Sequence, residues 1–345
     1  MQEHDRLFMQ RALELARLGL GYVSPNPMVG CVVVHQGCII GEGWHRQYGG
    51  AHAEVNAIES VADKSLLSQS TVYVSLEPCN HWGKTPPCTD LLLQHKPKRV
   101  VICNADTNPK AAGGLQRLAA AGIKVEAGLL EKEGRWLNRR FFAVVEQNRP
   151  YIIFKWAQTA DGYMARSDYS SKWISNAYAR QLVHKWRGEE DAIMVGRNTA
   201  RYDNPQLTNR DWPGYPRQPL RVVIDRQLLL PQSLHLFDGS HPSICYNLKE
   251  DREAHNLIFK KIPSVDFWQH LLQDLKGRGV QSVLIEGGPQ LFAQLSELGL
   301  WDEIRVFIAP HSFGSGLAAP RLQGHLLKTE SIHDNQLQWW VQKPF

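Results

Sequence analysis

The sequence lacks any long apolar run: no stretch approaches about 18 uninterrupted apolar residues, the length typical of a membrane-spanning helix. The amino terminus, MQEHDRLFMQ, is charged and lacks the apolar core of a secretory signal. No run of like charges stands out, and the net charge of +5 is the small difference between 39 basic and 34 acidic residues. These features argue against a membrane protein and against a nucleic-acid-binding protein, and they predict a cytoplasmic location.

Cysteine is also sparse. The six cysteines are Cys31, Cys38, Cys79, Cys88, Cys103 and Cys245. In a reducing cytosol they are expected to be buried small hydrophobes or metal ligands and not disulfides. Four of them (Cys31, Cys38, Cys103 and Cys245) lie in apolar segments typical of strands, and we expect these in the core.

With 345 residues, the chain is long enough for two domains.

The first half of the chain alternates patterns typical of strands and helices. Helices are expected over 5–18, from His52 through Ile58, over 89–94 (opened by Cys88), over 115–121 and over 131–146. Strands are expected over 31–34, 38–40, 71–75, 99–102 and 123–126, with a hairpin turn at Gln36-Gly37. This alternation predicts a three-layer α/β domain.

A polar break at Gln147-Asn148-Arg149-Pro150 then predicts a domain boundary, with one domain over 1–147 and another over 148–345. In the second half, strands are expected over 151–156, 192–195, 220–224, 282–285 and 304–308. Helices are expected over 178–186, 267–276 and 290–298. The stretch 204–219 is rich in Pro, Asn and Gly and predicts a surface loop. The whole is therefore a two-domain α/β protein.

The strongest chemical signal is His52-Ala53-Glu54 followed by Pro78-Cys79 and Cys88. One imidazole and two thiols can bind zinc and leave a fourth position for water. Zinc lowers the pKa of that water to near neutrality, and Glu54 would carry the proton from it to a leaving amine. His-x-Glu with Pro-Cys-x-x-Cys marks zinc nucleobase deaminases, although here the two cysteines lie nine positions apart instead of three. The sequence therefore predicts a zinc site with ligands His52, Cys79 and Cys88.

The surrounding segments narrow the family. They are PNPMVGC (25–31), AHAEV (51–55) and LEPCNHWGKTPPC (76–88). Together they resemble the deaminase half of the RibD family of bifunctional riboflavin-biosynthesis enzymes, in which this longer loop separates the second and third zinc ligands. The resemblance covers nearly all of 1–145 and implies a cytidine-deaminase-like fold with one zinc ion.

That resemblance also implies that Asn26, His81 and the loop around Lys84 and Thr85 contact a pyrimidine or its ribose phosphate. An amide can bind a base edge, and a cation can pair with a phosphate. A turn-stabilising role is an equally good interpretation for each of these residues taken singly. His35, His45 and His95 are interpreted as surface or structural histidines.

The second half carries weaker local signals. In Ile285-Glu286-Gly287-Gly288-Pro289, a strand runs into glycines and then a helix, which suits a phosphate at a helix amino terminus but is as often plain geometry. The full G-x-G-x-x-G fingerprint of a dinucleotide fold is absent. Arginines 187 and 210 have the side chain that binds phosphate bidentately, although Arg187 is equally compatible with an exposed helix position.

Motifs spread over 150–310 resemble the reductase half of the same family, which is similar in fold to dihydrofolate reductase and uses NADPH. The resemblance places Lys155 near the reacting centre. It implies that the cofactor is bound by Ala157 (where relatives commonly have glycine), Trp173, Thr199, Asp203, Gly288, Pro289, Gln290 and Leu291. The phosphoribosyl substrate would be held by Ser171, Arg187, Leu207, Arg210 and Glu286.

The resemblance thus predicts two successive reactions of riboflavin synthesis. The first half would deaminate 2,5-diamino-6-(5-phosphoribosylamino)pyrimidin-4(3H)-one, and the second would reduce the product's ribosyl group with NADPH. It also implies a homo-oligomer, a dimer or tetramer through the reductase domain. Two alternatives stay open: a nucleoside or tRNA deaminase with an unrelated carboxy-terminal domain, and a zinc-stabilised module without catalysis.

Overall fold

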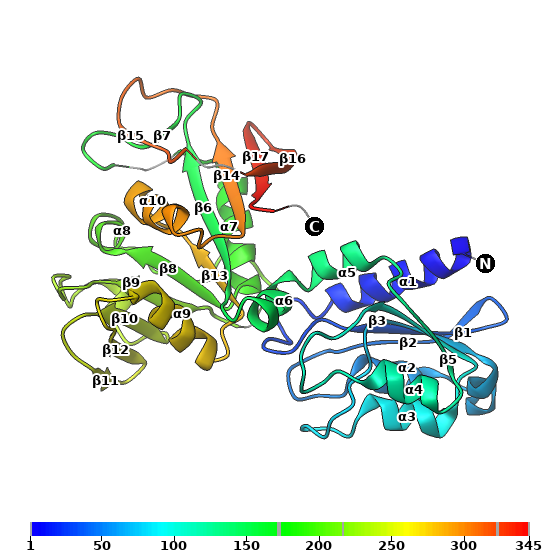
Figure 1. Ribbon diagram of the computed structural model, residues 1–345. Helices are drawn as coiled ribbons and strands as arrows, with labels where there is room; N and C mark the ends of the chain where they lie inside the picture. The colour runs from blue at the N-terminus through cyan, green and yellow to red at the C-terminus, as the bar shows by residue number, and fades with distance from the viewer. Residues whose placement is uncertain (1, 171–173, 216, 322–323, 344–345) are drawn as a thin grey trace. The chain divides into compact units, whose positions relative to one another are not determined.

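The computed structural model describes residues 2–170, 174–215, 217–321 and 324–343 (Figure 1). The chain divides into two compact units, Met1–Asn148 and Arg149–Pro344. Each unit has its own sheet with helices packed on it, which confirms the predicted pair of α/β domains. Among the described residues, no helix combines the length and the apolar character needed to cross a membrane.

Unit 1 is built around a five-stranded sheet with strand order β2-β1-β3-β4-β5. Its elements are, in chain order, α1 (Gln2–Arg17), β1 (Gly30–His35), β2 (Cys38–Trp44), α2 (Ala53–Ser60), η1 (Lys64–Gln69), β3 (Thr71–Leu76), α3 (Cys88–His95), β4 (Arg99–Asn104), α4 (Gly114–Ala120), β5 (Lys124–Ala127), α5 (Glu131–Leu137) and α6 (Arg139–Glu146). Strand β1 pairs antiparallel with β2 and β3, whereas β3, β4 and β5 run parallel.

Helices cover both faces of this sheet, as predicted (Figure 1). On one face, Cys31 and Val33 of β1 pack with residues of α2, α3 and α4. On the other face, Val32 and Val34 pack with residues of α1. Successive side chains of a strand alternate between faces, so one β-branched run serves both layers. Because β3 and β4 are parallel, the loops that follow them leave the sheet at the same edge.

The predicted hairpin turn is confirmed, but one residue beside it was placed wrongly. Gln36 and Gly37 join β1 to β2 with φ values of 50° and 78°, as a two-residue type I′ turn requires. Cys38 was expected in the core and is exposed. It directly follows the turn, and the first two residues of β2 are exposed.

The single charged helix expected over 131–146 is in fact two helices, α5 and α6, separated at Asn138. This residue is buried, and its side chain pairs with the backbone of Met28. Met28 N–H donates to Asn138 Oδ1 and Asn138 Nδ2 donates to Met28 O, both at 2.8 Å. These two bonds satisfy a buried backbone segment far away in the sequence. The break therefore fixes the chain around residue 28, next to the cavity described below.

Unit 2 is built around a ten-stranded sheet with strand order β11-β12-β10-β9-β8-β13-β6-β14-β17-β16. Its elements are, in chain order, β6 (Tyr151–Gln158), β7 (Tyr163–Ala165), α7 (Ala177–Glu189), β8 (Ala192–Gly196), α8 (Arg197–Asp203), β9 (Leu220–Ile224), η2 (His235–Phe237), β10 (Ser243–Asn247), β11 (Arg252–Ala254), β12 (Leu257–Lys261), α9 (Phe267–Gly277), β13 (Ser282–Ile285), α10 (Pro289–Glu297), β14 (Glu303–Ile308), β15 (Leu317–Ala318), β16 (His325–Ile332) and β17 (Asn335–Val341). The strands from β12 to β14 are parallel, and β11, β17 and β16 pair antiparallel at the two edges.

Strand β6 lies within this sheet, with aromatic side chains on one face and a charged side chain on the other. Phe154 and Trp156 pack against Phe292 of α10, with ring centroids 4.9 and 5.3 Å apart. Lys155 lies between them in the chain and therefore projects from the opposite face. The alternation of side chains along β6 thus places Lys155 on the face of the sheet opposite Phe154 and Trp156.

The stretch 204–219 is only in part the surface loop that its composition predicted: Arg210, Asp211, Pro213, Gly214 and Arg217 are exposed. Its described residues form no helix or strand, as expected. However, Leu207, Thr208 and Asn209 are buried, with Leu207 only 1% exposed. Leu207 has a φ of 53°, which is uncommon for a residue with a branched side chain. Residues 207–209 are therefore packed into the unit, and the other described residues of the loop lie mostly at the surface.

Candidate active sites

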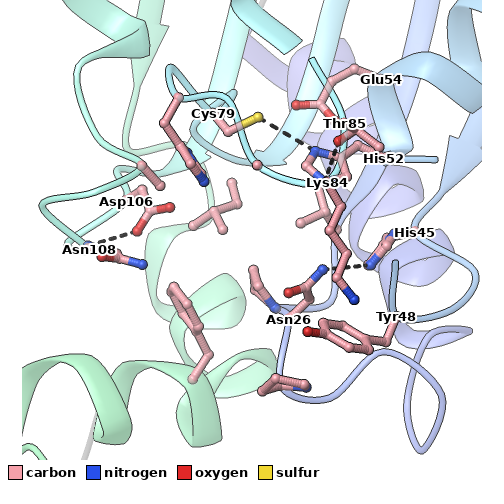
Figure 2. Close-up of a pocket in the computed structure, with 18 of the residues that line it drawn as sticks. Asn26, His45, Tyr48, His52, Glu54, Cys79, Lys84, Thr85, Asp106 and Asn108 are labelled. Atoms are coloured by element: carbon pink, nitrogen blue, oxygen red, sulfur yellow. Dashed lines mark hydrogen bonds between the residues drawn. The ribbon is translucent and has the colours of Figure 1, made fainter. Parts of the chain in front are cut away.

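Unit 1 contains a cavity of about 280 Å³ at the edge where β3 and β4 end (Figure 2). Four loop segments form its walls. The lining residues used below are Asn26, His45, Tyr48, Gly49, His52, Glu54, Glu77, Cys79, His81, Lys84, Thr85, Asp106 and Asn108. A pocket that combines an apolar body with a few polar groups is the usual form of a small-molecule site.

The three predicted metal ligands converge at this cavity, which His52 and Cys79 line. His52 immediately precedes α2, Cys79 lies in the loop after β3, and Cys88 is the first residue of α3. His52 Nδ1 lies 3.5 Å from Cys79 Sγ and 3.3 Å from Cys88 Sγ. The ligand atoms of all three residues lie within 4.8 Å of one another.

This donor set fits zinc. Tetrahedral zinc with Zn–N near 2.05 Å and Zn–S near 2.3 Å separates nitrogen from sulfur by about 3.6 Å, close to both distances in this site. His52 Nε2 lies 3.4 Å from Thr85 Oγ1, so the second ring nitrogen is oriented by a neighbour (Figure 2). Such second contacts fix the ring of a metal-binding histidine. The arrangement can therefore hold one zinc ion through Nδ1 and two thiolates.

Electrostatics at the three ligands favour a cation. Hydrogen bonding with Cys88 lowers the pKa of the Cys79 thiol to about 4, and the neighbouring His52 acts in the same direction. The shared hydrogen bond with Cys79, together with burial, raises the pKa of the Cys88 thiol. The hydrogen bond to Cys79 also raises the pKa of His52. A thiol with a lowered pKa is more easily deprotonated, and the thiolate is the form that binds a metal.

Glu54 projects into the same cavity from the first turn of α2. Its side chain is nearly inaccessible, at 3% exposure. Burial raises the pKa of its carboxyl group, and the negative charge of Cys79 adds to the effect. A carboxyl group that exchanges its proton closer to neutral pH is suited to general acid–base work.

His45 was interpreted as a surface or structural histidine, but it lines the cavity and is only 2% exposed. Its Nδ1 lies 3.0 Å from Ala51 O, and its Nε2 lies 3.1 Å from Asn26 Nδ2. Since a carbonyl can only accept, Nδ1 carries the proton and Nε2 accepts from the Asn26 amide. This chain of bonds turns Asn26 Oδ1 into an oriented acceptor at the cavity wall (Figure 2). No local sequence pattern signals it.

Glu77 and Asp106 form a further acidic group that sequence reasoning missed. The Glu77 carboxylate accepts from the backbone N–H groups of Asp106, Gly113 and Leu115, and so fixes the loop after β4. Asp106 accepts from Asn108 N–H at 2.8 Å. Burial raises the pKa of Asp106 to about 6, opposed by that N–H and assisted by the charge of Glu77. Both Asp106 and Asn108 line the cavity.

The mouth of the cavity carries the remaining predicted residues of unit 1. His81, Lys84 and Thr85 line it, and all three belong to the loop between Cys79 and Cys88. His81 and Lys84 are exposed, whereas Thr85 is half-buried. The structure therefore brings together the metal ligands, Glu54 and every residue predicted to contact the pyrimidine or its phosphate.

In unit 2, the structure brings together Lys155, Arg187 and Glu286. Arg187 forms two bonds to the Glu286 carboxylate, from Nε at 2.8 Å and from a terminal nitrogen at 2.9 Å. Lys155 Nζ lies 3.7 Å from the same carboxylate. Burial alone would raise the pKa of Glu286, but the charges of Arg187 and Lys155 bring it down to about 2. Burial lowers the pKa of Lys155, opposed by Glu286.

Leu207 and Arg210, which were also predicted to hold the substrate, lie in the segment after α8. Arg187 donates to Thr208 O at 3.2 Å, which ties the buried segment at Leu207 to the cluster. Arg210 N–H donates to His184 Nδ1 at 3.3 Å, while its guanidinium is half exposed and lies 3.9 Å from Asp211. Arg210 is thus positioned through its backbone.

The residues predicted to bind the cofactor surround the ends of β8 and β13. Helix α10 begins at Pro289, and Gly288 is its N-cap residue. A Cβ placed on Gly288 would lie 3.8 Å from Thr199 Oγ1, and Asn198 Nδ2 lies 3.4 Å from Gln290 Oε1. Leu291 lies close to Gly287. Ala157 is the second-to-last residue of β6, and Asp203 is the last residue of α8. Ser171 and Trp173 lie outside the described residues.

Comparison with known proteins matches both units to family models. Residues 2–104 match the cytidine and deoxycytidylate deaminase zinc-binding region. Residues 150–339 match the RibD C-terminal domain.

Curated relatives and solved structures match nearly the full length. The chain is 40% identical over 324 residues to the riboflavin biosynthesis protein RibD of Aquifex aeolicus, covering 92% of this chain and 90% of the relative. It is 36% identical to RibD of Escherichia coli, covering 90% and 89%. A crystal structure of a diaminohydroxyphosphoribosylaminopyrimidine deaminase/5-amino-6-(5-phosphoribosylamino)uracil reductase from Thermotoga maritima superposes with a TM-score of 0.90, at 36% identity and 99% coverage of both chains. Acinetobacter baumannii RibD, form 1, gives a TM-score of 0.89 at 33% identity, covering 99% of this chain and 100% of that chain.

Proposed function

The chain belongs to the RibD family, and from that premise we propose how its two sites divide the work. As a member, it is a bifunctional deaminase and reductase of riboflavin biosynthesis. Residues 1–147 would hydrolytically deaminate 2,5-diamino-6-(5-phosphoribosylamino)pyrimidin-4(3H)-one. Residues 148–345 would reduce the ribosyl group of the resulting 5-amino-6-(5-phosphoribosylamino)uracil to ribityl with NADPH.

The observation that carries the deaminase proposal is the cluster of His52, Cys79 and Cys88 beside a cavity that Glu54 also lines. A zinc ion held by the three ligands supplies a Lewis acid that brings the pKa of water to about 7. The buried Glu54 carboxylate accepts a proton from the attacking water and delivers it to the departing amine. Its burial keeps bulk water away from that proton between the two transfers.

The other cavity residues would hold the substrate. Asn26 Oδ1, oriented by His45, accepts from the amino groups of the pyrimidine. Asp106 and Asn108 offer acceptors and donors to the ribose hydroxyls. His81 and Lys84 at the mouth would bind the phosphate, with the Lys84 ammonium donating charged hydrogen bonds to it. His45, Asp106 and Asn108 thereby join the residues assigned from sequence.

For the reductase, we propose that Glu286 holds the Lys155 ammonium beside the reacting ribosyl carbon. NADPH supplies the hydride when it is bound. The amino-terminal N–H groups of α10, with Thr199 and Asp203 nearby, would bind its phosphates and ribose. Arg187, Leu207, Arg210 and Ser171 would hold the substrate, and Trp173, Ala157 and Gly288–Leu291 would pack along the cofactor. The cluster of Lys155, Arg187 and Glu286 supports this assignment.

We further propose a cytoplasmic enzyme that assembles as a dimer or tetramer through unit 2. The alternative of a zinc module without catalysis expects a fourth protein ligand that closes the metal site. In the described part of the chain, the group of candidate ligands has three members, and a cavity opens beside them. That geometry favours a catalytic site over a structural one.

The direct test is to incubate the zinc-loaded protein with the diaminopyrimidine phosphate, with and without NADPH. Ammonia release without NADPH, and NADPH oxidation only after deamination, is the expected result. If the zinc-loaded protein releases no ammonia, the deaminase assignment is wrong. Release from cytidine or adenosine instead would favour a nucleoside deaminase.

A further inference from the structure

The side chain of Lys84 bridges two walls of the cavity mouth in unit 1. Its backbone belongs to the loop between Cys79 and Cys88, whereas its ammonium lies 4.0 Å from the centroid of the Tyr48 ring, in the segment before α2. Both residues line the cavity. Figure 2 shows the lysine extending from the loop toward the tyrosine. The ammonium is therefore held away from its own loop by a contact with another segment.

The segment around Tyr48 is shaped to receive this ammonium. Tyr48 N–H donates to Tyr22 O at 3.2 Å, which anchors the backbone, while the side chain is 47% exposed. Gly49 follows with a φ of 81°, and a Cβ there would lie 3.6 Å from Lys84 Nζ. A ring face and a residue without a side chain thus lie together beneath the cation.

We propose that Tyr48 is a positioning residue that holds the Lys84 ammonium ready to pair with the phosphate of the deaminase substrate. This inference rests on the proposed function, which supplies a phosphoribosyl substrate. An ammonium over an aromatic face is attracted by the ring and still has N–H donors for an anion. Because the contact orders a long, exposed side chain before the substrate arrives, binding loses less rotamer freedom.

The effect belongs to substrate binding. The pair acts on the phosphate and not on the ring carbon that loses its amine, so it changes KM and spares kcat. Tyr48→Leu keeps an apolar side chain of moderate size and removes the aromatic face. We expect KM to rise about three- to fivefold in this variant, the size of an exposed cation–π contact, with kcat within about twofold of the unchanged protein. Tyr48→Phe keeps the aromatic ring, and its KM is expected to equal that of the unchanged protein.

Three comparisons separate this role from a general structural one. In a Lys84→Gln background, Tyr48→Leu is expected to change KM no further, because the partner of the ring is gone. With the dephosphorylated substrate, Tyr48→Leu is expected to leave KM unchanged. Tyr178→Leu, at an exposed tyrosine of unit 2, is the matched control. An unchanged or lowered KM in Tyr48→Leu, or the same rise without Lys84, overturns the proposal.

Binding of ribose 5-phosphate, measured by calorimetry, tests the contact without catalysis. The proposal expects weaker binding by Tyr48→Leu than by Tyr48→Phe. Equal binding by both overturns the role of Tyr48. If binding weakens as expected but the zinc-loaded protein releases no ammonia, the proposed deaminase function fails and the role of Tyr48 stands.

Discussion

At the scale of single residues, Glu54 is the proposed acid–base group of the deaminase. It is buried in the first turn of α2, and that burial raises its pKa. We predict that Glu54→Gln lowers kcat for ammonia release by about 10²- to 10⁴-fold, the usual contribution of a positioned acid–base group. Zinc content, measured by atomic absorption, is expected to stay at one ion per chain. Loss of zinc along with activity would mean that Glu54 supports the metal site instead.

Glu286 makes a prediction about pH. Its pKa is about 2 in the folded protein, below its ordinary value of 4.5. A carboxylate with a depressed pKa stabilises the fold above pH 4.5 and loses that contribution as the pH falls toward 2. Arg187 and Lys155 both lower the pKa of Glu286. Removing Arg187 should therefore move the acid unfolding of unit 2 to higher pH.

The measurement for Arg187→Gln is acid unfolding followed by tryptophan fluorescence. Glu286 keeps Lys155 as a partner, so the loss should be smaller than the roughly 3–5 kcal/mol of a fully unpaired buried charge, but stability at pH 7 should still fall. Lys249→Gln, an exposed lysine of the same unit, serves as the control. An acid midpoint that is the same in Arg187→Gln and in the control would rule out the pair as a source of stability.

The residues of the metal site were predictable, whereas their neighbours were not. His52, Glu54, Cys79 and Cys88 follow from two short motifs, His-x-Glu and Pro-Cys followed by a second cysteine, whose residue types match the chemistry. His45 and Glu77 have no such pattern. Their roles arise from bonds to Asn26 and to the loop at Asp106, which only the folded chain brings together.

At the scale of elements, the packing of α2 against β2 positions the deaminase site. A Cβ on Gly43 of β2 would lie 2.3 Å from Ala57 N, within the backbone of α2. We predict that Gly43→Ala displaces α2 and with it His52 and Glu54, costing about 1–3 kcal/mol of stability as overpacking does. Zinc affinity, measured by competition with a chelator, should fall together with kcat.

Gly277→Ala is a matched control, because a Cβ there meets no atom within 4 Å. It lies at the end of α9 in unit 2 and should change neither zinc affinity nor ammonia release. If Gly43→Ala binds zinc as tightly as this control, the close packing of α2 on β2 does not position the ligands.

Several elements with β-branched runs were predicted, but the buried strand β10 was missed. The β-branched runs of β1, β3 and β9 indicated buried strands, and each is buried in the structure. Hairpin β16-β17 was missed, because β16 is exposed along nearly its whole length and carries no apolar alternation. The helix expected over 131–146 was wrong at Asn138, since its break depends on Met28, a residue distant in the sequence.

At the scale of the whole molecule, the central claim is that one chain carries two independent sites that act in sequence on one phosphorylated intermediate. The metal ligands and Glu54 lie in unit 1, and Lys155, Arg187 and Glu286 lie in unit 2. A variant that disables one site should therefore leave the other reaction intact.

The most direct test mixes two such variants, Glu54→Gln and Lys155→Met, both zinc-loaded and supplied with NADPH. Each alone should fail to convert the diaminopyrimidine phosphate to the ribityl product: the first releases no ammonia, and the second stops at the aminouracil. The mixture is expected to restore the full conversion, measured by chromatography of the product. A mixture that forms no ribityl product, although Glu54→Gln alone reduces added aminouracil phosphate and Lys155→Met alone releases ammonia, would contradict the account.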